Sequence, residues 1–193
     1  DIVNRRTFPD TIVQARSNFD SHGYSIAEIC YVSEPTGDKM HYANVPYRAL
    51  LPKGLEGLIV TGLGISGHRD AMPIMRMQPD IQNMGYAAGV AAATAAREGK
   101  TFRTIDIKKL QRHLVEKGNL PAEVLDWEDN AIVDIERLAA AVKGLGKQYK
   151  GVGLVLAQWE EALPQMRLAY AATRNFAEKL VYAHVLGIMG DPT

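Results

Sequence analysis

The chain has 193 residues, of which 47% are hydrophobic and 23% charged, and its 22 basic side chains balance its 22 acidic ones. This length supports a sizeable core in one domain, or in one domain with an appendage, and the composition excludes intrinsic disorder. The balance holds in both halves, with 9 basic and 9 acidic residues in 1–97 and 13 of each in 98–193, so we expect no nucleic-acid partner.

The first sixty residues predict extended structure. Residues 11–15 and 25–32 are rich in β-branched and aromatic side chains, which favour strands. A second extended run covers 41–51, and Pro46 within it favours an edge strand or a bulge. The short apolar run 58–61 predicts a strand buried on both faces.

From Asp80 the apolar residues recur at helical spacing, which predicts a helix that stops at Gly99. Asp106 is a typical N-cap for a second helix over 107–117, closed by Gly118. Both helices follow from local signals.

Residues 119–130 form a polar, proline-containing connection, so we predict two domains, 1–118 and 119–193. The second is helical throughout, with helices expected at 133–142, near 153–163, and at 165–174 and 176–189. The predicted fold class is α/β (α+β as an isolated fragment), followed by an all-helical extension.

The segment 58–67 matches a strand that runs into G-x-G-x-x-G, through Gly62, Gly64 and Gly67. One alternative is therefore an NAD(P)-binding Rossmann domain. It requires a helix that starts near Gly67 and continues through Pro73, because the helix N-terminus binds the pyrophosphate. A broken segment at 67–78 would exclude it.

A longer pattern extends over residues 61–89. It consists of Thr61-Gly62, Ser66, Asp70-Ala71, Arg76, Pro79, Gly85 and Ala87-Ala88-Gly89. This pattern resembles the C-terminal flavin-contacting motif of the FAD-dependent oxidoreductase family with the glutathione-reductase-type FAD fold. Upstream, 8–10, 20–23 and 46–52 also fit, and the resemblance covers roughly 4–125.

The resemblance implies FAD as the cofactor of the intact protein. It also implies a set of cofactor-binding residues, namely Gly62, Ser66, Arg69, Arg76, Pro79 and Gly85. Leu63 replaces an arginine that is usual in the family, and Arg69 is our candidate to supply the lost charge. The helix from Asp80 would direct its N-terminal N–H groups at the flavin or the pyrophosphate, with small residues permitting close approach. The alternative is that these small residues only allow tight helix–sheet packing.

Three residues are candidates for catalysis. His22 could be a general base or a substrate contact, or else a locally hydrogen-bonded surface residue. Arg48 could bind a carboxylate or a flavin carbonyl, or form an ordinary ion pair. His68 lies within the flavin-end loop, whereas His41 falls in a predicted strand, where a structural role is expected. The histidines lack zinc-ligand spacing, so we expect no metal site.

Residues 182–192 are similar to the end of a helix in a HEAT-type repeat, although a plain C-terminal helix is the alternative. A non-enzymatic helical interaction module is therefore a further possibility for the whole chain.

Cys30 is the only cysteine, which excludes an intrachain disulfide and argues against a cysteine-built zinc site. The stretch 84–96 is too short and too rich in Gly and Ala to span a membrane. We expect a soluble protein, cytoplasmic or periplasmic.

The chain starts without Met and ends abruptly, so we expect a C-terminal fragment of a longer FAD-dependent oxidoreductase. The parent would transfer a hydride or an electron pair between an unknown small-molecule substrate and FAD. The fragment would be inactive alone, because its partner, the N-terminal FAD-binding half, is missing. Faces that normally meet that half would favour self-association.

Overall fold

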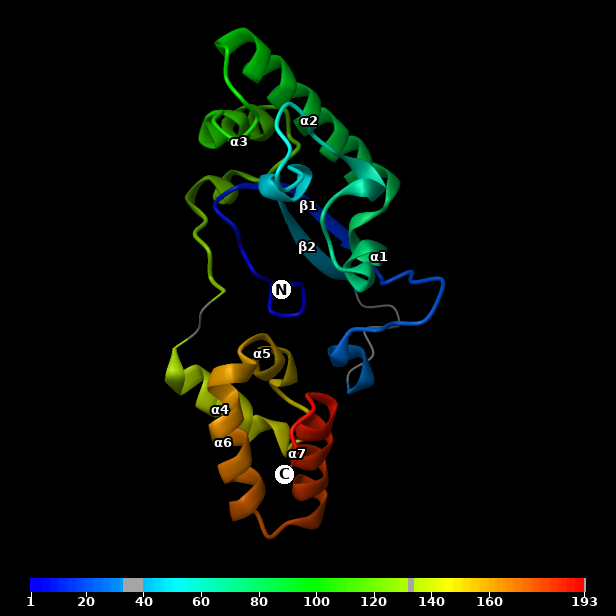
Figure 1. Cartoon of the computed structure of the whole chain (residues 1–193), viewed down its shortest axis with the longest axis vertical. Helices are drawn as coiled ribbons and strands as arrows, with labels where there is room; N and C mark the ends of the chain where they lie inside the picture. Colours follow the sequence, from blue (N-terminus) through cyan, green and yellow to red (C-terminus); the bar gives the residue numbers. More distant parts are fainter. Residues whose placement is uncertain (33–39, 132–133, 193) are drawn as a thin grey trace. The chain divides into compact units, whose positions relative to one another are not determined.

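The computed structural model describes residues 1–32, 40–131 and 134–192. The described residues form two compact units, one of 1–24 and 40–131 and the other of 25–32 and 134–192. The fold is α/β with a helical extension (Figure 1), as predicted. The boundary at 118–119 stays a prediction, because compactness does not define where a family domain ends.

The first unit is built on a two-stranded antiparallel sheet of β1 (Thr11–Ser17) and β2 (His41–Pro46). Pro46 faces Thr11, and the register shifts between Thr11 and Val13. Pro46 was expected to favour an edge strand or a bulge, and the sheet is irregular opposite this proline, which cannot donate to the ladder. The extended run expected over 41–51 is wrong beyond Pro46, because Tyr47–Leu50 form a 3-10 helix, η2.

The long helix α2 (Gln78–Glu98) packs against β1 and ends at Gly99, which has a left-handed φ of 62°. The side chains that it buries are Asp80, Met84, Ala87, Ala88, Ala91 and Ala95. Helix α3 (Ile107–Glu116) follows, and the Asp106 side chain accepts from the Lys109 N–H as its N-cap. Both helices were predicted from their caps and their period.

Two predicted strands are wrong. Residues 25–32 contain a 3-10 helix, η1 (Glu28–Tyr31), instead of a strand, and Ile29 and Val32 pack against the helical core of the second unit. The β-branched composition favoured a strand, but these apolar side chains are covered by helices and not by a sheet. Residues 58–61 belong to no strand, and the Val60 N–H donates to the Leu50 carbonyl outside any ladder.

Residues 119–131 are part of the first unit, although their composition is that of a linker. A short 3-10 helix, η5 (Ala122–Asp126), packs against α3. Beyond it, Asp129 receives two hydrogen bonds of 3.0 Å from the Arg6 guanidinium, and the Thr7 hydroxyl donates to the Glu128 carbonyl at 2.6 Å. This clamp ties the segment to the start of the chain.

The second unit contains α4 (Ile135–Leu145), α5 (Val152–Ala157), α6 (Trp159–Ala172) and α7 (Phe176–Ile188). In Figure 1, α6 and α7 form an antiparallel hairpin. A break was predicted at Pro164, but this residue lies inside α6, and the helices part instead at Gln158.

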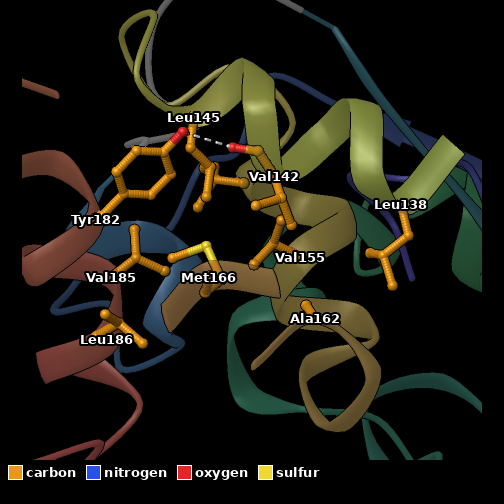
Figure 2. Close-up of a cluster of buried hydrophobic side chains, with 10 residues drawn as sticks. Leu138, Val142, Leu145, Val155, Ala162, Met166, Tyr182, Val185 and Leu186 are labelled. Atoms are coloured by element: carbon orange, nitrogen blue, oxygen red, sulfur yellow. Dashed lines mark hydrogen bonds between the residues drawn. The ribbon is translucent and has the colours of Figure 1, made fainter. Parts of the chain in front are cut away.

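The helices of the second unit enclose one apolar core. Figure 2 shows Met166 from α6 among Val142, Val155 and Val185, while the Tyr182 hydroxyl donates to the Val142 carbonyl at 3.2 Å. Burial raises the pKa of Tyr182, with a smaller contribution from the nearby Glu178 carboxylate. No helix of the described residues is both long and apolar enough to cross a membrane.

Candidate functional site

The glycine loop, which we define as residues 61–67, forms a tight turn in front of α2. A 3-10 turn covers Gly62–Gly64, and Gly62 has a φ of +67°, a conformation that favours glycine. A Cβ atom at Gly62 would lie 3.6 Å from the Ile81 side chain, so the loop touches the first turn of α2. The Ser66 N–H donates to the Ala49 carbonyl at 2.9 Å, while its side chain is exposed.

The segment after the glycine loop is broken into short pieces. A 3-10 turn, η4 (Arg69–Ala71), leads into the single-turn helix α1 (Met72–Met75), and α2 begins only at Gln78. No helix starts at Gly67 and continues through Pro73. The Rossmann alternative is excluded by this break, because its pyrophosphate site needs an uninterrupted helix there.

The N-terminus of α2 has no side-chain cap, and Pro79 occupies its first turn, exposed. Asp80 is 7% exposed, and its carboxylate accepts from the Arg16 N–H at 3.4 Å. Burial raises the pKa of Asp80, although the hydrogen bond and the Arg16 charge act in the opposite direction. The remaining N–H groups of the first turn and the helix dipole make this end of α2 attractive to an electronegative group.

Gly85 and Gly89 lie on a face of α2 that the described residues leave open. A Cβ atom at either position would have no neighbour within 4 Å. The alternative that the small residues of α2 only allow tight packing therefore fits the buried alanines, such as Ala88, and does not fit the two glycines. The open face leaves room for another group to approach the helix backbone.

His22 lies in an exposed turn and contacts Asp20. Its Nε2 atom lies 2.8 Å and 2.9 Å from the two carboxylate oxygens of Asp20. The Arg76 guanidinium donates to the Asp20 carbonyl at 2.7 Å. Arg76, which was expected to bind the cofactor, holds the turn that carries His22.

Arg69 and His68 lie beside the same turn. Arg69 Nη1 donates to the Tyr24 carbonyl and, at 3.0 Å, to the Asp70 carboxylate, whose side chain is 6% exposed. The Nδ1 atom of His68 accepts from the Asp70 N–H at 3.1 Å and so caps η4. The structure therefore brings His22, His68, Arg69 and Arg76 into one cluster, which we call the turn cluster together with Asp20 and Asp70.

Arg48 lies elsewhere, at the opposite end of β1. Its Nη1 atom is 2.5 Å from an Asp10 carboxylate oxygen, and its guanidinium lies 4.9 Å from the centre of the Phe8 ring. Asp10 precedes the first residue of β1, whereas the turn cluster follows the last, so about 20 Å of strand separates them. The geometry around Arg48 is that of an ion pair with a stacked ring.

The alternative of a locally hydrogen-bonded surface histidine describes His22 as the structure has it, and the fold shows that the partner is Asp20, two residues away. His41 lies opposite Ser17 in the sheet, as expected for a structural residue. In the part of the chain that the structure describes, no group of three or more His, Cys, Asp or Glu side chains could hold a metal ion.

The model of the family described as FAD dependent oxidoreductase matches residues 1–114, more than half of the chain. The chain belongs to this family. Neither the curated proteins nor the solved structures gave a match. The match covers the sheet, the glycine loop, the turn cluster and α2, and it ends within α3.

Membership in the family implies FAD, and two observations fit that cofactor. The glycine loop lies against the first turn of α2, whose N-terminus has no side-chain cap. Beside it, Gly85 leaves open space where any larger residue would place a Cβ atom. Gly62, Pro79 and Gly85 lie at this end of α2 and, with Ser66, stay the candidate cofactor residues there.

Proposed function

We propose that the chain forms the flavin-end part of an FAD-dependent oxidoreductase of the glutathione-reductase type. The intact protein transfers a hydride or an electron pair between a small-molecule substrate and FAD, and the flavin supplies the redox chemistry when it is bound. The residues of this chain orient the flavin and the substrate. The observation that carries the proposal is the uncapped N-terminus of α2, placed against Gly62 and next to the open Gly85 face.

The cofactor residues have separate roles in this proposal. Gly62 and Ser66 keep the loop backbone close to the flavin ring, and Pro79 presets the backbone of the first turn of α2. Arg69 and Arg76 act indirectly, because they hold the turn that carries His22. His68 caps η4, the 3-10 turn that contains Arg69.

Tight binding of FAD also needs a βαβ unit for its ADP half. The sheet of the described residues has two antiparallel strands, so they contain no such unit. We therefore infer that the ADP-binding part lies outside these residues and that this chain alone neither retains FAD nor turns over.

The decisive experiment compares the two ends of the cofactor. Titration of the 193-residue chain with riboflavin, followed by flavin fluorescence, is expected to give weak, saturable binding, and ADP is expected not to compete. Displacement of riboflavin by ADP would overturn the assignment of this chain to the flavin end of the cofactor. Stoichiometric yellow cofactor retained through purification would overturn the claim that a further part is required.

Two glycine variants sharpen this test. Gly85→Ala fills open space on α2, so it should weaken riboflavin binding without loss of stability. Gly187→Ala in α7 fills equally open space far along the chain and is the matched control, expected to leave binding unchanged. Equal riboflavin affinity in both variants would contradict a flavin site at Gly85.

A second candidate role, as an interaction module, concerns the helical unit. Phe176 and Leu180 are 74% and 54% exposed and lie four residues apart on α7, hence on one face. We infer self-association through this face, because two exposed apolar side chains are available there to pack against a second copy. Sedimentation equilibrium of Phe176→Ser tests it, since a monomeric wild-type chain would contradict the inference.

A further inference from the structure

The turn that carries His22 adopts a backbone conformation that few residues accept. Phe19 and His22 have φ angles of +62° and +47°, in the left-handed region. Such conformations cost free energy in residues other than glycine, and they persist where the surrounding structure holds them. The Phe19 side chain, only 6% exposed, anchors one end of the turn.

Two arginines from the flavin-end segment hold the backbone on both sides of His22. Arg76 donates to the Asp20 carbonyl, and Arg69 donates to the Tyr24 carbonyl. A Cβ atom at Gly23 would lie 3.1 Å from the Arg69 guanidinium, so the turn and Arg69 are in close contact. The position of His22 is therefore coupled to the loop that follows the glycine motif.

The imidazole itself is oriented by a carboxylate. An ionised Asp20 can only accept hydrogen bonds, so the Nε2 atom of His22 carries the proton that they share. In the neutral imidazole the Nδ1 atom then keeps its lone pair. The side chains of His22 and Asp20 are 70% and 48% exposed, so the pair is open to small molecules.

We propose that His22 is the proton acceptor for the substrate, and that Asp20 is its positioning residue. The substrate class is a small alcohol or amine, which presents an O–H or N–H group to Nδ1. This inference deepens the proposed function and rests on it, because the flavin is the oxidant.

The step balances for an alcohol as follows. The O–H bond breaks and its proton moves to Nδ1 of His22, while the C–H bond breaks and its hydrogen leaves with the electron pair as hydride to the flavin. A C=O bond forms, so the substrate loses two electrons and the flavin gains them. For an amine, N–H and C=N replace O–H and C=O.

Two measurements on the 193-residue chain test the pair without flavin. Long-range ¹⁵N–¹H NMR reports which ring nitrogen of His22 is protonated. Hydrolysis of p-nitrophenyl acetate reports an accessible imidazole lone pair, because acetyl transfer to Nδ1 releases p-nitrophenolate and water then returns the free ring and acetate.

We expect the proton on Nε2 in the wild-type chain and in Asp20→Glu, and a mixture of tautomers in Asp20→Asn. The ester hydrolysis should fall several-fold in His22→Gln and in Asp20→Asn, and Asp20→Glu should restore most of it. His113→Gln is the control, because His113 pairs with the Tyr86 hydroxyl and should leave the rate unchanged.

A proton on Nδ1, or an unchanged rate in His22→Gln, would overturn the proposal. Circular dichroism of each variant checks that the fold is kept. Riboflavin titration of the same samples separates the two claims. Absence of riboflavin binding, together with the expected tautomer and ester hydrolysis at His22, would refute the proposed function. Riboflavin binding without that tautomer or that hydrolysis would refute only this inference.

Discussion

The Gln111 side-chain amide donates to the Thr11 carbonyl at 2.8 Å, which joins α3 to the start of β1 across one hundred residues. The same nitrogen donates to the Pro9 carbonyl at 3.0 Å, and Gln111 is fully buried. Its Oε1 atom has no hydrogen-bond partner among the described residues. In the core, the side chain therefore acts through its donor group alone.

Gln111→Leu tests this relationship. It leaves two backbone carbonyls without their donor, and we expect a loss of about 1–3 kcal/mol in the free energy of unfolding. Urea denaturation measures the change, with Gln82→Leu on the exposed side of α2 as the control. Equal stabilities of the two variants would show that the buried amide contributes nothing.

Two glycines in the helical unit should respond in opposite directions to alanine. A Cβ atom at Gly144 would lie 2.8 Å from the Lys150 carbonyl oxygen, so the backbone must shift and Gly144→Ala should destabilise the unit. Gly187 in α7 has open space, and Gly187→Ala should stabilise the helix by up to about 1 kcal/mol. Thermal unfolding of both variants checks the order, and a higher melting temperature for Gly144→Ala would contradict it.

Asp80 should make stability depend on pH in the acid range. Burial raises its pKa in the folded state, so the folded chain binds the proton more tightly than the unfolded chain does. Its carboxylate therefore weakens the fold as the pH rises through the ordinary aspartate pKa toward the raised one. Asp80→Asn should be more stable than the wild-type chain at pH 7, and the difference should vanish below the ordinary aspartate pKa.

Urea denaturation at pH 3 and pH 7 measures this difference. Asp134→Asn is the comparison, because Asp134 is an exposed N-cap residue that asparagine replaces well. A wild-type chain more stable than Asp80→Asn at pH 7 would contradict the expectation.

Tyr47 should resist ionisation. Its hydroxyl donates to the Phe102 carbonyl at 3.0 Å, and burial raises its pKa to about 12, against a smaller opposing effect of Arg103. The neutral phenol therefore makes its full contribution to the free energy of unfolding below pH 10. This contribution is lost as the pH rises toward about 12. Absorbance at 295 nm follows the titration.

Tyr47→Phe removes the hydrogen bond, with an expected loss of about 0.5–1.5 kcal/mol at pH 7. The gap to the wild-type chain should narrow above pH 10. Tyr24, which is 91% exposed, provides the control variant Tyr24→Phe. A Tyr47 whose pKa is not raised would show that its hydroxyl is not held in the core.

The elements that could be predicted from the sequence are those with local signals. Asp106 caps α3 and Gly99 ends α2 because each acts on its own neighbours in the chain. The run at 25–32 was misassigned because its apolar residues bury against helices far along the chain. Pro164 did not break α6, although a proline inside a helix removes one backbone hydrogen bond, so this local signal was misleading.

The candidate site was predictable as a set of residues and only partly as an arrangement. The motif identified Arg69 and Arg76, but their bonds to the carbonyls of Tyr24 and Asp20 depend on how the chain returns to the sheet. Arg48 gave no sequence signal of its pairing with Asp10, because that contact also arises from the fold.

The place of η1 has a consequence for the order of synthesis. Ile29 and Val32 leave the ribosome well before α4–α7, which bury them. The helical core is therefore complete only when residues 25–32 and α4–α7 have all been made, and its long-range contacts slow folding. A helical unit made without residues 25–32 would expose the apolar surface that they cover, which makes this unit a poor candidate for transfer to another protein by a single cut.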